Sequence, residues 1–145
     1  MIIHVYEADE FRGGRESEQR VLYFEERKEE GHYCTTFEEF IKYCMVYEKL
    51  LDAPFIGSGY QTIYEIEKEV NDIYPTAVKV ISNEDFLKNK HLSQLFFPEE
   101  LVKSKMDFPS RIIKCVSVYE QEWNYLFHAA ESDVGFYGYN WITTA

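Results

Sequence analysis

The segment WNYLFHAAESDVGFYGYNWI, residues 123–142, decides the fold class. Apolar residues occupy every second position of its first half, as expected for a β-strand: Trp123, Tyr125, Phe127 and Ala129. Residues 131–135 then predict a turn, and Phe136 to Ile142 predict the next strand. The preceding stretch from Ile112 to Tyr119 is rich in β-branched residues and predicts another strand. The C-terminal part of the chain therefore predicts three antiparallel strands.

The N-terminal segment predicts a β-hairpin. Ile2 to Tyr6 and Val21 to Phe24 have the composition of strands. The polar stretch from Arg12 to Gln19 contains two glycines and is expected to be the loop that joins them. Residues 25–30 are polar and precede Gly31, as in a solvated strand end followed by a turn.

The middle of the chain predicts helices. Thr36 and Glu39 fit a capping box, in which the threonine hydroxyl accepts from a free backbone N–H and the glutamate reaches back to the cap. Apolar residues at helical spacing follow until Asp52-Ala53-Pro54 ends the run: Phe37, Phe40, Ile41, Cys44, Met45 and Leu51. A second helix is expected from about Tyr60 to Ile73, ended by Tyr74-Pro75. Its expected inward residues are Ile63, Ile66, Val70 and Ile73.

Ala77 to Ile81 predict a strand, and two short helices are expected to begin after Ser82 and at Phe97. Two strands, two helices, one strand, two helices and three strands in succession predict an α+β fold. The 145 residues suit one domain, 1–145. We expect a mostly antiparallel sheet, built from the N-terminal hairpin and the C-terminal strands, with about four helices, two of them short, against one face.

The charge of the chain excludes several functions. It has 26 Asp and Glu against 15 Lys and Arg, a formal net charge of −11. Such a charge repels a phosphate backbone, so direct nucleic-acid binding is not expected. No stretch approaches the roughly 18 consecutive apolar residues of a membrane-spanning helix. Met1 to Glu7 lack a secretory-signal pattern, and we expect a cytoplasmic protein that does not bind membranes.

The sequence contains no recognisable catalytic or cofactor motif. Cys34, Cys44 and Cys115 are odd in number and widely spaced in apolar contexts, which indicates reduced core thiols and no disulfide. His32 and Cys34 are a close pair of metal-ligand residue types, whereas a structural zinc ion requires four ligands. We therefore predict no metal, no cofactor and no catalytic residue, and we do not expect an enzyme.

Acidic and aromatic residues together predict a surface that binds a basic protein. Tyrosine and tryptophan supply much of the energy of protein interfaces, and carboxylates can occupy lysines and arginines that normally hold phosphates. We expect a small inhibitor that occludes a nucleic-acid-processing enzyme. It would be an immunity protein against a nuclease-type toxin or a phage-encoded inhibitor of a bacterial defence system. The predicted partner-binding residues are Glu25, Glu26, Glu29, Glu30, Trp123, Tyr125, Tyr137, Tyr139 and Trp141. Alternatively, helices or a second subunit cover both faces of the last strands and bury these rings.

A group of arginines supports a different function. Arginines that follow an aromatic residue can bind a phosphate while the ring stacks on a base. The protein would then be a ligand-binding module that sequesters a small nucleotide or cyclic nucleotide, aided by C-terminal aromatic residues across the interface of a homo-oligomer. The arginines can instead pair with Glu16 and Glu18 around a plain turn. The ligand-binding residues of this alternative are Phe11, Arg12, Arg15 and Arg20.

Overall fold

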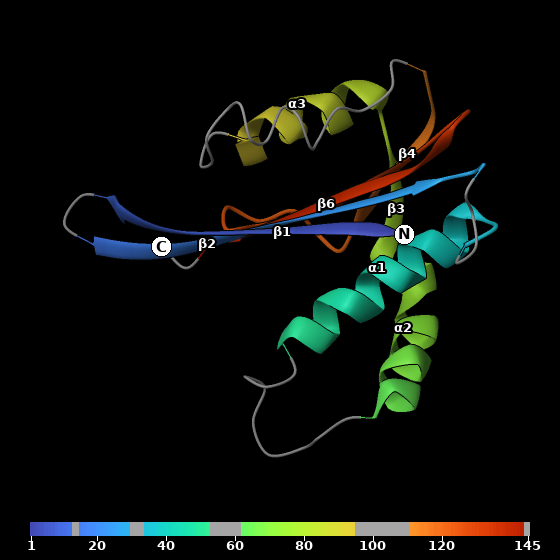
Figure 1. Cartoon of the computed structure of the whole chain (residues 1–145), viewed down its shortest axis with the longest axis horizontal. Coiled ribbons are helices and arrows are strands. Elements are labelled where there is room, and N and C mark those ends of the chain that lie inside the picture. Colours follow the sequence, from blue (N-terminus) through green and yellow to red (C-terminus); the bar gives the residue numbers. More distant parts are fainter. Residues whose placement is uncertain (13–14, 30–33, 53–61, 95–110, 144–145) are drawn as a thin grey trace.

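Figure 1 presents a computed structural model of the chain, which describes residues 1–12, 15–29, 34–52, 62–94 and 111–143. Of residues 6, 8–12, 15–18, 52 and 89–94 it describes the backbone alone. The elements in chain order are β1 (Ile2–Arg12), β2 (Arg15–Arg27), α1 (Phe37–Asp52), α2 (Ile63–Ala77), β3 (Val78–Ile81), α3 (Asn83–Gln94), β4 (Ile112–Val118), β5 (Tyr125–Ser132) and β6 (Gly135–Thr143). The six strands form one antiparallel sheet in the order β1-β2-β6-β5-β4-β3. The predicted α+β class and antiparallel sheet are confirmed.

Helices cover both faces of this sheet, so the expectation that all helices pack against one face is wrong. Figure 1 shows the sheet edge-on, with α1 and α2 on one side and α3 on the other. The reason lies in β2, where the residues of both faces are apolar. Leu22 and Phe24 belong to the core beneath α1 and α2, whereas Val21 and Tyr23 belong to the core beneath α3.

The same two-sided burial applies to β6. Phe136 stacks on Phe37 and Phe40 of α1, with ring centroids 6.0 and 5.5 Å apart. On the other face, Tyr139 packs against Phe86 of α3, with ring centroids 5.1 Å apart. Helices therefore cover the C-terminal aromatic residues from both sides, and most of these rings stabilise the core.

Helix α1 begins where the sequence predicts. The Thr36 hydroxyl accepts from the backbone N–H of Glu39 at 3.2 Å. The Glu39 carboxylate accepts from the backbone N–H of Thr35 at 2.9 Å, one residue earlier than the capping box predicts. Of the predicted apolar face, four residues are buried and two are partly buried against the core: Phe40, Ile41, Cys44 and Met45, then Phe37 and Leu51.

Helix α2 is displaced toward the C-terminus relative to the prediction. Thr62 caps it, because the Thr62 hydroxyl accepts from the backbone N–H of Glu65 at 3.2 Å. Ile63 is then a first-turn residue and 58% exposed, so its predicted inward position is wrong. The predicted end at Tyr74-Pro75 is also wrong, because Pro75 lies in the last turn and the helix continues to Ala77. The missing N–H of a proline removes only one helical hydrogen bond there.

Helix α3 starts at the predicted place, where the Ser82 hydroxyl accepts from the backbone N–H of Asp85 at 3.1 Å. Within the five described ranges there are three helices, and about four were predicted; the helix expected at Phe97 lies outside the described residues. None of the three is long and apolar enough to cross a membrane.

The N-terminal hairpin is longer than predicted. Its strands pair continuously from Ile2 opposite Glu25 to Arg12 opposite Arg15. The expected loop from Arg12 to Gln19 is therefore wrong, since most of it is strand. A polar sequence can extend a hairpin because the ladder is built from backbone hydrogen bonds, which do not require an apolar side chain.

Candidate functional site

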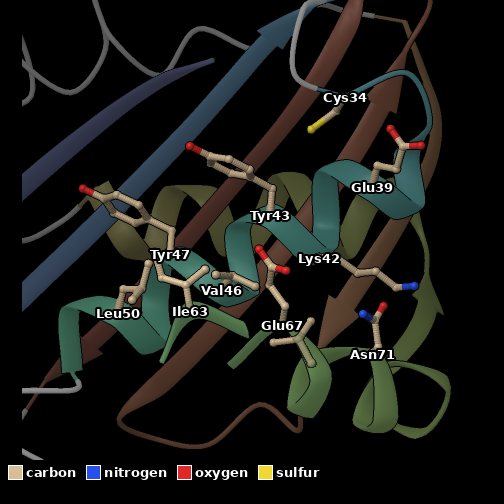
Figure 2. Close-up of a pocket in the computed structure, with 11 residues that line it drawn as sticks. Cys34, Glu39, Lys42, Tyr43, Val46, Tyr47, Leu50, Ile63, Glu67 and Asn71 are labelled. Carbon is tan, nitrogen blue, oxygen red and sulfur yellow. The ribbon is translucent and has the colours of Figure 1, made fainter. Parts of the chain in front are cut away.

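A groove of about 490 Å³ lies between α1 and α2. Figure 2 shows that side chains of both helices form its walls, with Ile63 beside Tyr47 and Leu50, and with Lys42 and Asn71 at the opposite end. The lining residues are Cys34, Glu39, Lys42, Tyr43, Val46, Tyr47, Leu50, Ile63, Glu67, Val70 and Asn71.

Helical spacing explains why these residues share one groove. On α1 they recur at intervals of three or four residues from Glu39 to Leu50, beside the stripe that enters the core. On α2, Ile63, Glu67 and Val70 follow the same spacing. The sequence-based prediction missed this groove, although Tyr43, Val46, Tyr47 and Leu50 form a second apolar stripe on α1. That stripe is the signal by which it could have been found.

The groove leaves apolar surface open to solvent. Tyr43 and Leu50 of α1 are exposed, as are Ile63 and its neighbour Tyr64 of α2, which is 75% exposed. Contiguous apolar surface with a polar rim is typical of protein-interaction sites in water-soluble domains.

Acidic residues outnumber lysines around the groove. The groove is lined by two carboxylates, Glu39 and Glu67, and by one lysine, Lys42, which pairs with Glu38 at 3.6 Å and lies over the Tyr74 ring. Among the residues that the structure describes, Glu39 and Glu67 form no ion pair. The rim of the groove therefore has an excess of negative charge.

The turn between β4 and β5 presents a tryptophan beside further carboxylates. Glu122 and Tyr125 exchange backbone hydrogen bonds of 3.0 and 3.3 Å, which leaves Trp123 and Asn124 as a two-residue loop. Trp123 is 72% exposed, and Glu120 and Glu122 are exposed beside it. An exposed indole in a tight turn is a ready anchor for a partner.

This turn is connected to α1. The Tyr125 hydroxyl donates to the Glu48 carboxylate at 2.7 Å, and Glu48 is buried. Tyr119 lies nearby, where burial raises its pKa and the negative charges of Glu48 and Glu69 raise it further. The Trp123 turn and the C-terminal half of α1 therefore belong to the same end of the molecule.

Several residues predicted to bind a partner are not at the surface. Tyr137 and Tyr139 are buried, and Glu26 is only 2% exposed, so their expected exposure is wrong. Glu26 lies under the start of α1, where its Oε1 accepts from the backbone N–H of Cys34 at 3.3 Å. Alternate residues of β2 belong to opposite faces, and Glu26 is on the face that α1 covers, in line with Leu22 and Phe24.

The other predicted partner-binding residues that the structure describes lie at or near the surface. Glu25 is half-buried and accepts from the Tyr23 hydroxyl at 3.0 Å. Trp141 is half-buried and donates through Nε1 to Gln19 at 3.3 Å. Tyr125 is half-buried, Glu29 is exposed, and Glu30 lies outside the described residues. Trp123 is thus the one aromatic residue of the predicted set that is exposed.

The arginines of the alternative ligand site are placed by the strand register. Arg12 is the partner of Arg15 across the end of the hairpin. Arg20 is half-buried on β2. The side chains of Phe11, Arg12 and Arg15 lie outside the described part of the chain.

None of the three cysteine thiols lies in an environment that would make it reactive. The three cysteines are buried and form no disulfide, as predicted. Burial raises the pKa of Cys34 to about 12 and that of Cys115 to about 11, and it raises the pKa of Cys44 well above its ordinary value. Within the described residues, no group of three or more His, Cys, Asp or Glu side chains could hold a metal ion.

Comparison with known proteins gave no match: no family model matches the chain, and no curated protein or solved structure is significantly similar to it. The groove and the Trp123 turn are therefore the features from which a function can be inferred.

Proposed function

We propose that the protein is a small acidic inhibitor that binds a basic, nucleic-acid-processing protein and occludes its substrate-binding surface. It would act in the cytoplasm, as an immunity protein against a nuclease-type toxin or as a phage-encoded inhibitor of a bacterial defence enzyme. The observation that carries this proposal is the apolar groove between α1 and α2, whose rim includes carboxylates that form no described ion pair.

The groove suits a basic amphipathic segment of the partner. The apolar side of such a segment would contact Tyr43, Leu50 and Ile63, which are exposed. Its lysines or arginines would pair with acids of the rim such as Glu67. Apolar anchors supply most of the binding energy in an interface of this kind, whereas complementary charge supplies orientation and speed of association.

The net charge favours such a partner over nucleic acid itself. At −11 the chain attracts a surface that has evolved to bind phosphates, and this attraction weakens as salt screens the charges. Trp123 would add a second anchor at the end of α1, where the Tyr125 hydroxyl contacts Glu48. By binding the partner at both places, the protein would cover the lysines and arginines with which the partner contacts its substrate.

The test starts with capture from the native host and ends with purified proteins. Tagged wild-type protein should retain a basic protein at low salt and lose it as salt rises. With the pair purified, the wild-type chain should inhibit the partner's activity on nucleic acid. Glu67→Lys, Ile63→Ser and Trp123→Ser should each weaken binding about tenfold or more, the loss of about 1.4 kcal/mol.

Two matched variants control for charge and for apolar surface elsewhere. Asp133→Lys makes the same charge change as Glu67→Lys, and Val134→Ser makes an apolar loss like that of Ile63→Ser, both at the exposed turn between β5 and β6. Both should bind within about threefold of wild type. The proposal fails if no basic protein is retained at low salt, or if a saturating amount of wild-type chain leaves the partner fully active.

A further inference from the structure

A second cavity lies on the opposite face of the sheet, beneath α3, and is independent of the groove. Its volume is about 280 Å³, whereas one water molecule occupies about 30 Å³ of the liquid. Five of its lining residues are polar, and they come from α3, β4, β5 and the turn after β4: Asp85, Lys88, Ser117, His128 and Gln121, with Ile81 of β3.

His128 has one ring nitrogen fixed by the core. Its Nδ1 lies 3.1 Å from the Tyr139 hydroxyl, and that hydroxyl donates to the backbone carbonyl of Phe86 at 2.6 Å. Because the tyrosine proton is committed to Phe86, the tyrosine oxygen must accept from His128, which places the histidine proton on Nδ1. The other nitrogen, Nε2, then has a lone pair and acts as a hydrogen-bond acceptor.

The histidine stays neutral at physiological pH. It is 2% exposed, and burial lowers its pKa to about 4, although the nearby Asp85 carboxylate acts in the opposite direction. The wall that His128 forms is thus an uncharged acceptor at pH 7, not a cation that could hold an anion.

The rest of the cavity offers one charge of each sign. Asp85 and Lys88 are three residues apart on α3, so they share one side of the helix. Ser117 is the cross-strand partner of His128, and its hydroxyl donates to the Tyr119 carbonyl at 3.1 Å, which leaves the serine oxygen as an acceptor. An anion would be repelled by Asp85 and a cation by Lys88. A small molecule that carries both charges could pair with each of these residues.

We propose that this cavity binds a small zwitterion of the α-amino acid class, with its carboxylate on Lys88 and its ammonium group donating to Asp85 and to Nε2 of His128. The site would be a small-molecule site separate from the protein-binding groove, because α3 and the pair of α1 and α2 lie on opposite faces of the sheet. Its existence does not depend on the proposed inhibitory function.

Nuclear magnetic resonance of the ¹⁵N-labelled full chain tests the site directly. We expect at least one of the protein amino acids, titrated to millimolar concentration, to shift the Nε2 resonance of His128 in a saturable way. Inorganic phosphate, succinate and 1,4-diaminobutane carry charge of one sign and should not do so. Lys88→Ala and Asp85→Asn each remove one ligand partner at an exposed position and should weaken binding at least tenfold.

Lys79→Ala is the matched control, since Lys79 is exposed on β3 and does not line the cavity. It should leave the affinity unchanged within about twofold. The proposal is overturned if no amino acid shifts His128, if phosphate, succinate or the diamine binds as tightly as the amino acid, or if Lys79→Ala weakens binding as much as Lys88→Ala.

Discussion

The hydroxyl of Tyr125 donates a hydrogen bond of 2.7 Å to the carboxylate of Glu48, and so joins β5 to α1 across 77 positions of sequence. It does so directly after the turn that exposes Trp123. The position of this turn relative to α1 is therefore set by a contact between a phenol and a buried carboxylate.

Removing this hydroxyl should destabilise the fold. Tyr125→Phe deletes a hydrogen bond to a charged group, and we expect the free energy of unfolding in urea to fall by about 1.5–3 kcal/mol. Tyr64→Phe is the control, because Tyr64 is exposed on α2, and it should change stability by less than about 0.5 kcal/mol. Equal stabilities for the two variants would contradict a structural role for the contact.

Two glycines of β6 should respond in opposite ways to alanine. A Cβ atom at Gly135 would lie 2.7 Å from the backbone oxygen of Glu26, so Gly135→Ala should lower the free energy of unfolding by about 1–3 kcal/mol. At Gly138 the nearest atoms would be 3.5–3.6 Å away, which is ordinary contact. Gly138→Ala should therefore be neutral or stabilising by up to about 1 kcal/mol. Thermal or urea unfolding distinguishes the pair, and a destabilised Gly138→Ala would mean that this space is not available.

The cysteines should be unreactive in the native protein. With pKa values raised by burial to about 12 for Cys34 and about 11 for Cys115, almost no thiolate exists at pH 8. A disulfide reagent should label none of the three thiols within minutes under native conditions and all three in denaturant. Rapid labelling of the native chain at one site, identified by mass spectrometry, would show that this thiol is accessible.

Acid should weaken the fold through His128. Burial lowers its pKa from 6.5 to about 4, so between these values the unfolded chain binds more protons than the native chain. The stabilising contribution of the neutral His128 is complete above pH 6.5 and is lost as the pH falls toward 4. The free energy of unfolding should therefore decrease by about 2 kcal/mol between pH 7 and pH 4.5.

Comparison with His128→Gln isolates this contribution, because the carboxylates titrate alike in both proteins. The difference in unfolding free energy between wild type and variant should shrink as the pH falls. If the variant does not fold, the titration of the His128 ring by nuclear magnetic resonance decides the matter, and a midpoint near 6.5 would contradict the burial argument.

Local patterns predicted most of the elements, but they did not predict what covers them. The hydroxyls of Thr36 and Ser82 mark two helix starts because a cap is a local hydrogen bond. The burial of Tyr139 depends on Phe86, 53 positions earlier, and no local pattern records that contact. Alternating residues in the sequence therefore predict a strand with one exposed face, although helices lie on both of its faces in the structure.

The candidate site was predictable in part. Trp123 is predicted as one of the aromatic residues of an alternating strand; that position is wrong, because β5 begins at Tyr125 and Trp123 lies in the turn before it, where it is exposed. The groove between α1 and α2 was missed because the sequence shows only one of its walls, the apolar stripe on α1, and α2 forms the other wall only in the folded chain. The cavity at His128 was missed for the same reason, since Asp85 and Ser117 lie on α3 and β4 and meet only in the folded chain.

The pairing of β2 with β6, from Gln19 opposite Thr143 to Arg27 opposite Gly135, has a consequence for synthesis on the ribosome. At about 5–20 residues per second, β6 is translated roughly 5–20 s after β2. During that interval the first hairpin has no neighbour along β2, and the apolar run from Val21 to Phe24 has no completed core on either side. A nascent chain that stalls before residue 135 therefore exposes an open strand edge, which makes translation pauses in the segment between α3 and β6 an aggregation hazard.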